Sequence, residues 1–94
     1  MVKILELRDK KGKPVYLTDE RYNHIKRHPE MQNSLSMIEE TIKNPQKITV
    51  FADIKYYYKY YKNRKSKAKY LRVIVKYLNG EGFIITAYFV MGIA

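Results

Sequence analysis

The sequence predicts a single α+β domain in which N-terminal helices pack on a four-stranded antiparallel sheet. Three observations support this prediction. Helical periodicity is confined to the first half of the chain, β-branched and aromatic residues dominate from residue 46 onward, and 94 residues allow one modest core. No internal repeat or linker divides the sequence. We therefore expect one domain over residues 1–94.

The N-terminal segment predicts extended structure followed by a short helix. Two short segments, residues 3–8 and 15–17, flank the turn cluster Lys-Lys-Gly-Lys-Pro, and a hairpin or two separate extended pieces both fit this pattern. Thr18 then supplies a capping hydroxyl ahead of two acidic residues, which is typical of a helix start. Pro29 disfavours helical geometry in the residue before it. The first helix is therefore expected over residues 19–28.

The next segment predicts a second helix and then strands. Leu35, Ile38 and Ile42 recur at helical spacing, which predicts a helix over residues 34–43 that ends before an Asn-Pro pair. The composition then changes to β-branched and aromatic residues, which predicts four strands. Their expected ranges are residues 47–52, 55–62, 70–78 and 83–91.

The last two strands allow a prediction of which side chains face the helices. Each carries an alternating apolar set, and both sets should point into the core. Because a register shift of one residue reverses the faces of a strand, this match requires an odd-residue loop or a glycine bulge in the connection, residues 79–82. The two expected inward sets are Leu71, Val73, Val75 and Tyr77, and Phe83, Ile85, Ala87 and Phe89. The opposite face would then carry Arg72, Lys76, Thr86 and Tyr88.

The charge of the chain indicates an anionic partner. Nineteen Lys and Arg residues against nine Asp and Glu residues give a formal charge of +10. The stretch between Asp53 and Glu81 has no acidic residue and nine cationic ones, interleaved with tyrosines. For any single lysine a solvated surface position is the alternative, but the cluster favours RNA or DNA contact. The residues expected to bind RNA are Lys55, Tyr58, Lys59, Lys62, Arg64, Lys65, Lys67, Lys69 and Lys76.

The two histidines of the chain are candidates for acid–base chemistry. His24 and His28 are four residues apart, so a continuous helix would place both imidazoles on one face. Histidine ordinarily changes its charge near physiological pH, so a neutral and a charged imidazole could serve as base and acid. The alternatives are a hydrogen bond from His24 to a nearby carbonyl and a capping role for His28 at the end of its helix.

Several other kinds of chemistry find no support in the sequence. Cysteine is absent, which excludes disulfides, thiolate metal sites and a cysteine nucleophile. The glycines are scattered, so there is no phosphate-binding loop, and no serine lies in a nucleophile elbow. The His-Ile-Lys-Arg-His segment has a zinc-compatible spacing, but it lacks the glutamate of the metalloprotease motif and holds two cations. No metal and no cofactor are expected.

The sequence also predicts a cytoplasmic protein without membrane contact. Charged residues interrupt the N-terminus every two or three positions, which is unlike a signal peptide. No apolar run approaches the roughly 18–20 residues that a membrane span requires.

Four segments carry a resemblance to a known group of proteins. They are Tyr16-Leu-Thr-Asp-Glu-Arg-Tyr-Asn-His-Ile-Lys-Arg-His-Pro-Glu-Met31, Ile42-Lys-Asn-Pro45, Lys69-Tyr-Leu-Arg-Val-Ile-Val75 and Ile85-Thr-Ala-Tyr88. Together they resemble the small phage-associated nucleases of the barnase/EndoU/colicin/RelE-like superfamily. The resemblance implies a compact fold of helices on a four-stranded sheet that cleaves RNA without metal, often as a toxin or effector. It places the functional signature on His24, His28, Arg72, Thr86 and Tyr88.

These residue types suit metal-free RNA cleavage. The reaction needs a deprotonated 2′-hydroxyl, a protonated 5′-oxygen and a stabilised phosphate charge. One histidine would be the base, and the second histidine or Tyr88 would be the acid. Arg72 and Lys76 would hold the phosphate, and Thr86 would orient an oxygen. Cross-strand packing is the alternative role for Thr86 and Tyr88.

Three hypotheses about function follow. The first is a metal-independent endoribonuclease, restrained by an acidic antitoxin or inhibitor protein. The second is a non-catalytic RNA-binding module, and the third is a basic subunit that docks on an acidic protein. The first two both predict salt-sensitive RNA binding, but only the nuclease requires the histidines for more than affinity. The third predicts no RNA cleavage.

Overall fold

The computed structural model describes residues 2–93. Within this range the chain forms six strands, two α-helices and one 3₁₀ turn, which confirms the α+β class. None of the helices between residues 2 and 93 is long and apolar enough to cross a membrane. The elements are β1 (Lys3–Arg8), β2 (Pro14–Thr18), α1 (Asp19–Ile25), η1 (Pro29–Met31), α2 (Leu35–Lys43), β3 (Lys47–Phe51), β4 (Ile54–Tyr60), β5 (Tyr70–Leu78) and β6 (Glu81–Val90).

The sheet differs from the prediction because it has six strands and not four. Its order is β1-β2-β6-β5-β4-β3, so the N-terminal hairpin β1/β2 extends the sheet ahead of both helices. Val15 and Tyr16 of β2 pair in parallel with Gly82 and Phe83 of β6, while all other neighbouring strands of residues 2–93 are antiparallel. A hairpin was one of the two arrangements that the sequence allowed for these segments, and the antiparallel β1/β2 pair selects it. The parallel contact between β2 and β6 was not predicted, because two residue pairs far apart in sequence leave no periodic signal.

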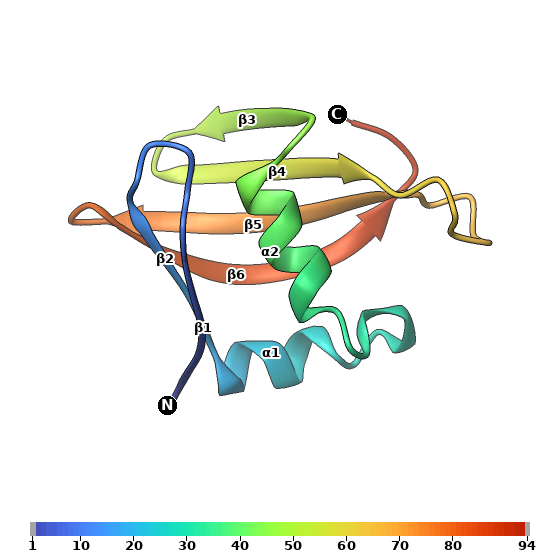
Figure 1. The fold of residues 1–94 in the computed structure, drawn as a ribbon, viewed down its shortest axis with the longest axis horizontal. Helices are drawn as coiled ribbons and strands as arrows, with labels where there is room; N and C mark the ends of the chain where they lie inside the picture. The colour runs from blue at the N-terminus through green and yellow to red at the C-terminus, as the bar shows by residue number, and fades with distance from the viewer. Residues whose placement is uncertain (1, 94) are drawn as a thin grey trace.

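The core lies between the helices and one face of the sheet. In Figure 1, α2 crosses this face, and α1 lies along the side of the sheet next to β6. Ile25 of α1, and Ile38 and Ile42 of α2, are fully buried in one apolar cluster with inward residues of β5 such as Val73. The other face of the sheet carries the strand side chains that alternate with the inward ones, and we call it the open face.

The open face is rich in tyrosine. Alternation along the paired strands puts six tyrosines on this face, together with Phe83, and Arg72 lies among them. The tyrosines are Tyr16, Tyr56, Tyr58, Tyr60, Tyr70 and Tyr88. The tyrosines of β4 and the loop after it are therefore divided between the two faces of the sheet, because Tyr57 and Tyr61 pack on the core side.

The helix α1 starts as predicted but ends three residues early. Thr18 is its N-cap and accepts a hydrogen bond from the backbone N–H of Arg21, at 3.3 Å. The last helical residue is Ile25, and the chain then turns so that His28 is extended, with φ −80° and ψ 119°. Pro29 imposes this geometry on His28 and begins η1. The second helix agrees with its predicted range to within one residue.

A tight turn and a bulge together set the faces of β5 and β6. Asn79 and Gly80 both have positive φ, at 53° and 80°, and form a two-residue turn of the kind that joins hairpin strands. The register then shifts, because Val75 pairs with Ile84 and Ile74 pairs with Thr86, which leaves Ile85 bulged.

The observed register differs in part from the predicted one. Ala87 and Phe89 point into the core as expected, but Ile84 replaces Ile85 there and Phe83 lies on the open face opposite Lys76. The correcting irregularity lies inside β6 and not in the glycine-containing connection. The prediction that Arg72, Lys76, Thr86 and Tyr88 share the face away from the core is confirmed.

A partly buried hydrogen-bonded chain connects the β1/β2 hairpin to the centre of the sheet. The hydroxyls of Tyr57 and Tyr77 are 2.5 Å apart, and Tyr77 donates to Oδ2 of Asp9 at 2.9 Å. The other oxygen of Asp9 accepts the backbone N–H groups of Lys11 and Lys13. Burial, the bond with Tyr57 and the bond with Asp9 raise the pKa of Tyr77 well above its usual range.

Replacing Tyr77 with phenylalanine should lower the free energy of unfolding by about 1–3 kcal/mol, because the buried residues Asp9 and Tyr57 lose a hydrogen-bonding partner. The raised pKa also predicts that wild-type stability falls as pH rises above about 10, since the unfolded tyrosine ionises there and the folded one does not. Urea unfolding at pH 7 and pH 10.5 checks both. Tyr70→Phe is the control, and equal urea midpoints for Tyr77→Phe and wild type would contradict the prediction.

Candidate active site

Arg72 occupies the middle of the open face. It lies on β5, where it pairs with Tyr58 of β4 on one side and Tyr88 of β6 on the other. Its Nε donates a hydrogen bond to the Tyr58 hydroxyl at 3.1 Å, and Nη1 donates to the Tyr88 hydroxyl at 2.9 Å. The guanidinium carbon is 5.9, 5.3 and 5.5 Å from the ring centroids of Tyr56, Tyr58 and Tyr88. The side chain is therefore held by aromatic groups from both neighbouring strands.

The charge of Arg72 is not neutralised by an acidic side chain in the part of the chain that the structure describes. The ion pair found there joins Lys43 to Glu39 on α2. Partial burial alone lowers the pKa of Arg72, but the hydrogen bonds with Tyr88 and Tyr58 outweigh it and the pKa is raised. A guanidinium has five N–H donors, and two of them bond the tyrosines, so three can reach an anion. Such a group suits a phosphate.

Two other predicted residues share this face. Thr86 pairs with Ile74, one step along the face from the Arg72–Tyr88 pair, and Lys76 is exposed opposite Phe83. Arg72, Thr86 and Tyr88 are thus brought together as predicted, with Tyr58 as a direct hydrogen-bonding partner of Arg72.

The helix α1 borders the open face along β6. β2 pairs with β6 only as far as Phe83, and α1 contacts β6 (Figure 1). Arg21 of α1 lines a pocket with Ile84 and Ile85 of β6, and the two elements run in the same direction in Figure 1. His24 follows Arg21 by three residues, about 4.5 Å along the helix axis. This displacement is in the direction in which β6 runs from Ile85 to Tyr88.

The two histidines do not form the predicted pair on one helix face. His24 is exposed on α1, in a hollow of about 310 Å³ whose lining includes Arg21 and Arg27, whereas His28 lies beyond the helix end as the N-cap of η1. The side chain of His28 makes no capping hydrogen bond. Within residues 2–93, neither imidazole forms a side-chain hydrogen bond, so no hydrogen bond connects the histidines to Arg72 or to its tyrosine partners.

The lysines expected to bind RNA are distributed over both faces. Lys55 and Lys59 point to the helix side, where the ammonium of Lys55 is 4.9 Å from the ring centroid of Tyr77 and that of Lys59 donates to the carbonyl of Asn44. Lys76 is on the open face with Arg72. The structure therefore divides a cluster that is continuous in sequence, because neighbouring residues of a strand point to opposite faces.

The basic loop between β4 and β5 uses some of its charges to hold itself together. Arg64 donates to the carbonyl of Ala68 at 3.0 Å, and its guanidinium lies 3.6 Å from the ring centroid of Phe89. Lys69 donates to the carbonyls of Lys62 and Arg64. The exposed lysines of this loop are Lys62, Lys65 and Lys67.

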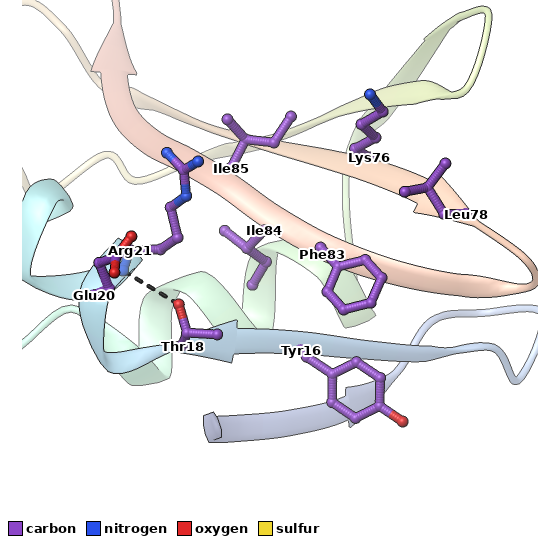
Figure 2. A pocket seen from close by; sticks show the side chains of 9 residues that line it. All are labelled: Tyr16, Thr18, Glu20, Arg21, Lys76, Leu78, Phe83, Ile84 and Ile85. Atoms are coloured by element: carbon purple, nitrogen blue, oxygen red, sulfur yellow. Dashed lines mark hydrogen bonds between the residues drawn. The ribbon is translucent and has the colours of Figure 1, made fainter. Parts of the chain in front are cut away.

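The sequence did not identify a pocket on the open face beside α1. This pocket has a volume of about 340 Å³ and lies where β2 leaves β6 (Figure 2). The three-residue spacing of Arg21 and His24 was a usable signal for the Arg21 wall, but Phe83 lies on the open face because the two-residue turn pairs it with Lys76. The lining residues are Tyr16, Thr18, Glu20, Arg21, Lys76, Leu78, Phe83, Ile84 and Ile85.

The zinc-compatible spacing of the histidines is not part of a larger group of ligands. Among residues 2–93, no three side chains of histidine, cysteine, aspartate or glutamate come together as a group that could hold a metal ion.

Comparison with known proteins identifies the family. A family model described as phage-Barnase-EndoU-ColicinE5/D-RelE like nuclease 2 matches residues 5–91. No curated protein and no solved structure gives a significant match. Of the strands and helices in residues 2–93, the matched range contains all but the first two residues of β1, and it includes Arg72, Tyr88 and both histidines. The chain therefore belongs to the phage-Barnase-EndoU-ColicinE5/D-RelE like nuclease 2 family, PBECR2.

Proposed function

We propose that this protein is an endoribonuclease that cleaves RNA on its open face without a metal ion. The observation that carries the proposal is Arg72, a positive charge without an acidic partner among residues 2–93, fixed between Tyr58 and Tyr88 at the centre of an aromatic surface. Family membership supports nuclease activity. RNA is the preferred substrate because its 2′-hydroxyl supplies an internal nucleophile that DNA lacks.

The proposed reaction is a transphosphorylation. A base removes the proton of the 2′-hydroxyl, and the 2′-oxygen attacks the adjacent phosphorus. The bond between phosphorus and the 5′-oxygen breaks, and an acid protonates that oxygen. The products are a 2′,3′-cyclic phosphate and a 5′-hydroxyl. Arg72 would stabilise the phosphate charge that grows in the transition state, assisted by Lys76, and Thr86 would orient a phosphate oxygen.

We assign the base role to His24. It belongs to α1, which contacts β6, the strand that carries Thr86 and Tyr88, whereas His28 lies after the helix end. Imidazole is the common general base of proteins near neutral pH. The acid is Tyr88 or His28. Tyr88 is favoured because its oxygen accepts a bond from Arg72, which leaves its own O–H free to donate.

The open face also suits the binding of unpaired RNA. Tyr56, Tyr60 and Tyr88 offer partly exposed rings on which bases can stack, and the net charge of +10 attracts phosphates. A non-catalytic RNA-binding module is the second candidate, favoured by the absence of hydrogen bonds between the histidines and the Arg72 group within residues 2–93.

The proposal includes a restraining partner. A cytoplasmic ribonuclease would damage the RNA of its own cell, so we include an acidic antitoxin or inhibitor protein that covers the open face. The charge of +10 supports such a partner, because opposite charges speed and direct association. The same charge would allow a basic subunit to dock on an acidic protein without cleaving RNA.

The deciding experiment is incubation of the purified protein with tRNA and single-stranded RNA in the presence of EDTA. We expect cleavage that leaves 2′,3′-cyclic phosphate ends, and no cleavage of DNA of the same sequence. Cleavage that EDTA abolishes would contradict the metal-independent reaction. Salt-dependent RNA binding without any cleavage would favour the RNA-binding module, and no RNA binding would favour the docking subunit.

A further inference from the structure

We propose that the pocket between β2, α1 and the bulge of β6 binds one unpaired nucleobase of the substrate. This inference rests on the proposed function, because it assigns a substrate contact to the same open face. The pocket opens on the same face of the sheet as Arg72, and its lining residue Lys76 lies on the same strand as Arg72. Lys76 is four residues from Arg72, a distance of about 13 Å along a strand.

The fold builds this pocket from two irregularities. β2 pairs with β6 only through Val15 and Tyr16, and the chain then leaves the sheet to begin α1 at Asp19. On the other side, the bulge at Ile85 displaces β6 at the same level. A depression of about 340 Å³ remains between them, which falls in the range of small-ligand sites. Figure 2 shows residues of β2, α1, β5 and β6 around it.

The walls of the pocket fit a flat aromatic ligand. The rings of Tyr16 and Phe83 have centroids 5.7 Å apart and are tilted by 37°. Leu78, Ile84 and Ile85 add apolar side chains to the lining. Aromatic and aliphatic surfaces of this kind can pack on the face of any of the four bases. A double-stranded substrate could not present a base in this way, so the base must be unpaired.

The charges around the pocket fit the phosphates on either side of that base. Arg21 reaches from α1 and Lys76 from β5 (Figure 2). The ammonium of Lys3 is 3.8 Å from the ring centroid of Tyr16 and adds a third positive charge. Glu20 is the acidic residue of the lining, and its carboxylate can accept a hydrogen bond from an exocyclic amino group of a base.

Adenosine monophosphate is a direct probe because it presents a base with an amino group and one phosphate. In NMR titrations of the ¹⁵N-labelled protein, we expect it to shift the backbone amides of Tyr16, Phe83 and Ile85. Ribose 5-phosphate, which lacks the base, should leave these amides unchanged. Absence of shifts at these amides with adenosine monophosphate at 10 mM would overturn the proposal.

Two variants test the assigned contacts. Phe83→Ala should weaken adenosine monophosphate binding by about tenfold, and Lys76→Ala, an exposed change that leaves the core intact, should weaken it several-fold. The matched control is Phe51→Ala, because Phe51 is 74% exposed on the edge strand β3 and lies outside the pocket. Equal affinity of wild type and Lys76→Ala would contradict the phosphate contact and with it the proposal.

The outcome is separable from that of the proposed function. Nucleotide binding in the pocket by a protein that never cleaves RNA would support the base site and refute the nuclease reaction. Cleavage by the wild type combined with an unchanged KM in Phe83→Ala would support the nuclease and refute the base site. If both proposals hold, Phe83→Ala raises KM for single-stranded RNA about tenfold and leaves kcat near its original value.

Discussion

Replacing Arg72 with alanine should reduce kcat/KM for RNA cleavage by about 100- to 1,000-fold. The change removes a preorganised donor group from the position where phosphate charge develops, and losses of this size follow the removal of one such donor in other enzymes. Tyr58 and Tyr88 would also lose the guanidinium that joins their hydroxyls. Arg72→Lys should recover only part of the activity, because an ammonium keeps the charge but lacks the planar fork.

The control for this prediction is Arg8→Ala. Arg8 lies on β1, three strands away from β5, and donates to the carbonyl of Gly12 at 2.8 Å. Thermal unfolding should show that Arg72→Ala remains folded, and binding of uncleavable 2′-O-methyl RNA measures the loss in affinity separately. Cleavage within threefold of wild type in a folded Arg72→Ala protein would refute the role of Arg72.

The local elements of this fold were readable from sequence because their signals are local. The strand over residues 70–78 was predicted at its observed ends, and α2 was predicted to within one residue. Hydrophobic matching also assigned Arg72 and Tyr88 to the open face. The two-residue turn alone would have turned Tyr88 to the core side. The unpaired residue Ile85 shifts the register by one, and Tyr88 therefore faces the same side as Arg72.

The parts that sequence did not predict depend on long-range geometry. The parallel contact between β2 and β6 consists of two residue pairs from opposite ends of the chain. The pocket beside it therefore has no signature in any one segment. The two-residue turn placed Phe83 on the open face and not in the expected core, and one unpaired residue, Ile85, then returned Ala87 and Phe89 to the core side.

The candidate catalytic residues divide in the same way. Arg72, Thr86 and Tyr88 came together because they lie on adjacent strands whose register the sequence constrains. Tyr58 was predicted as an RNA contact, but the structure buries it under Arg72, where it positions the guanidinium. The histidines do not share a helix face because α1 ends at Ile25, and Pro29 holds His28 in an extended conformation outside the helix.

The proposed role of His24 leads to the second large effect. His24→Ala should lower kcat for RNA cleavage by about 100- to 10,000-fold, the range that general acid–base catalysis contributes. Because His24 is exposed on α1 and bonds no other side chain within residues 2–93, its removal should leave stability nearly unchanged. Binding of 2′-O-methyl RNA should weaken less than threefold, because the base acts on the 2′-hydroxyl proton.

Imidazole added to the His24→Ala protein separates catalysis from a structural effect. A small imidazole can enter the space left by the side chain and accept the same proton, so cleavage should rise with imidazole concentration in this variant. Asn23→Ala, an exposed change on the same helix, should cleave like wild type and should not respond. Full activity of His24→Ala would exclude this histidine as the base. Lost activity without rescue, together with lost RNA binding, would place His24 among the binding residues.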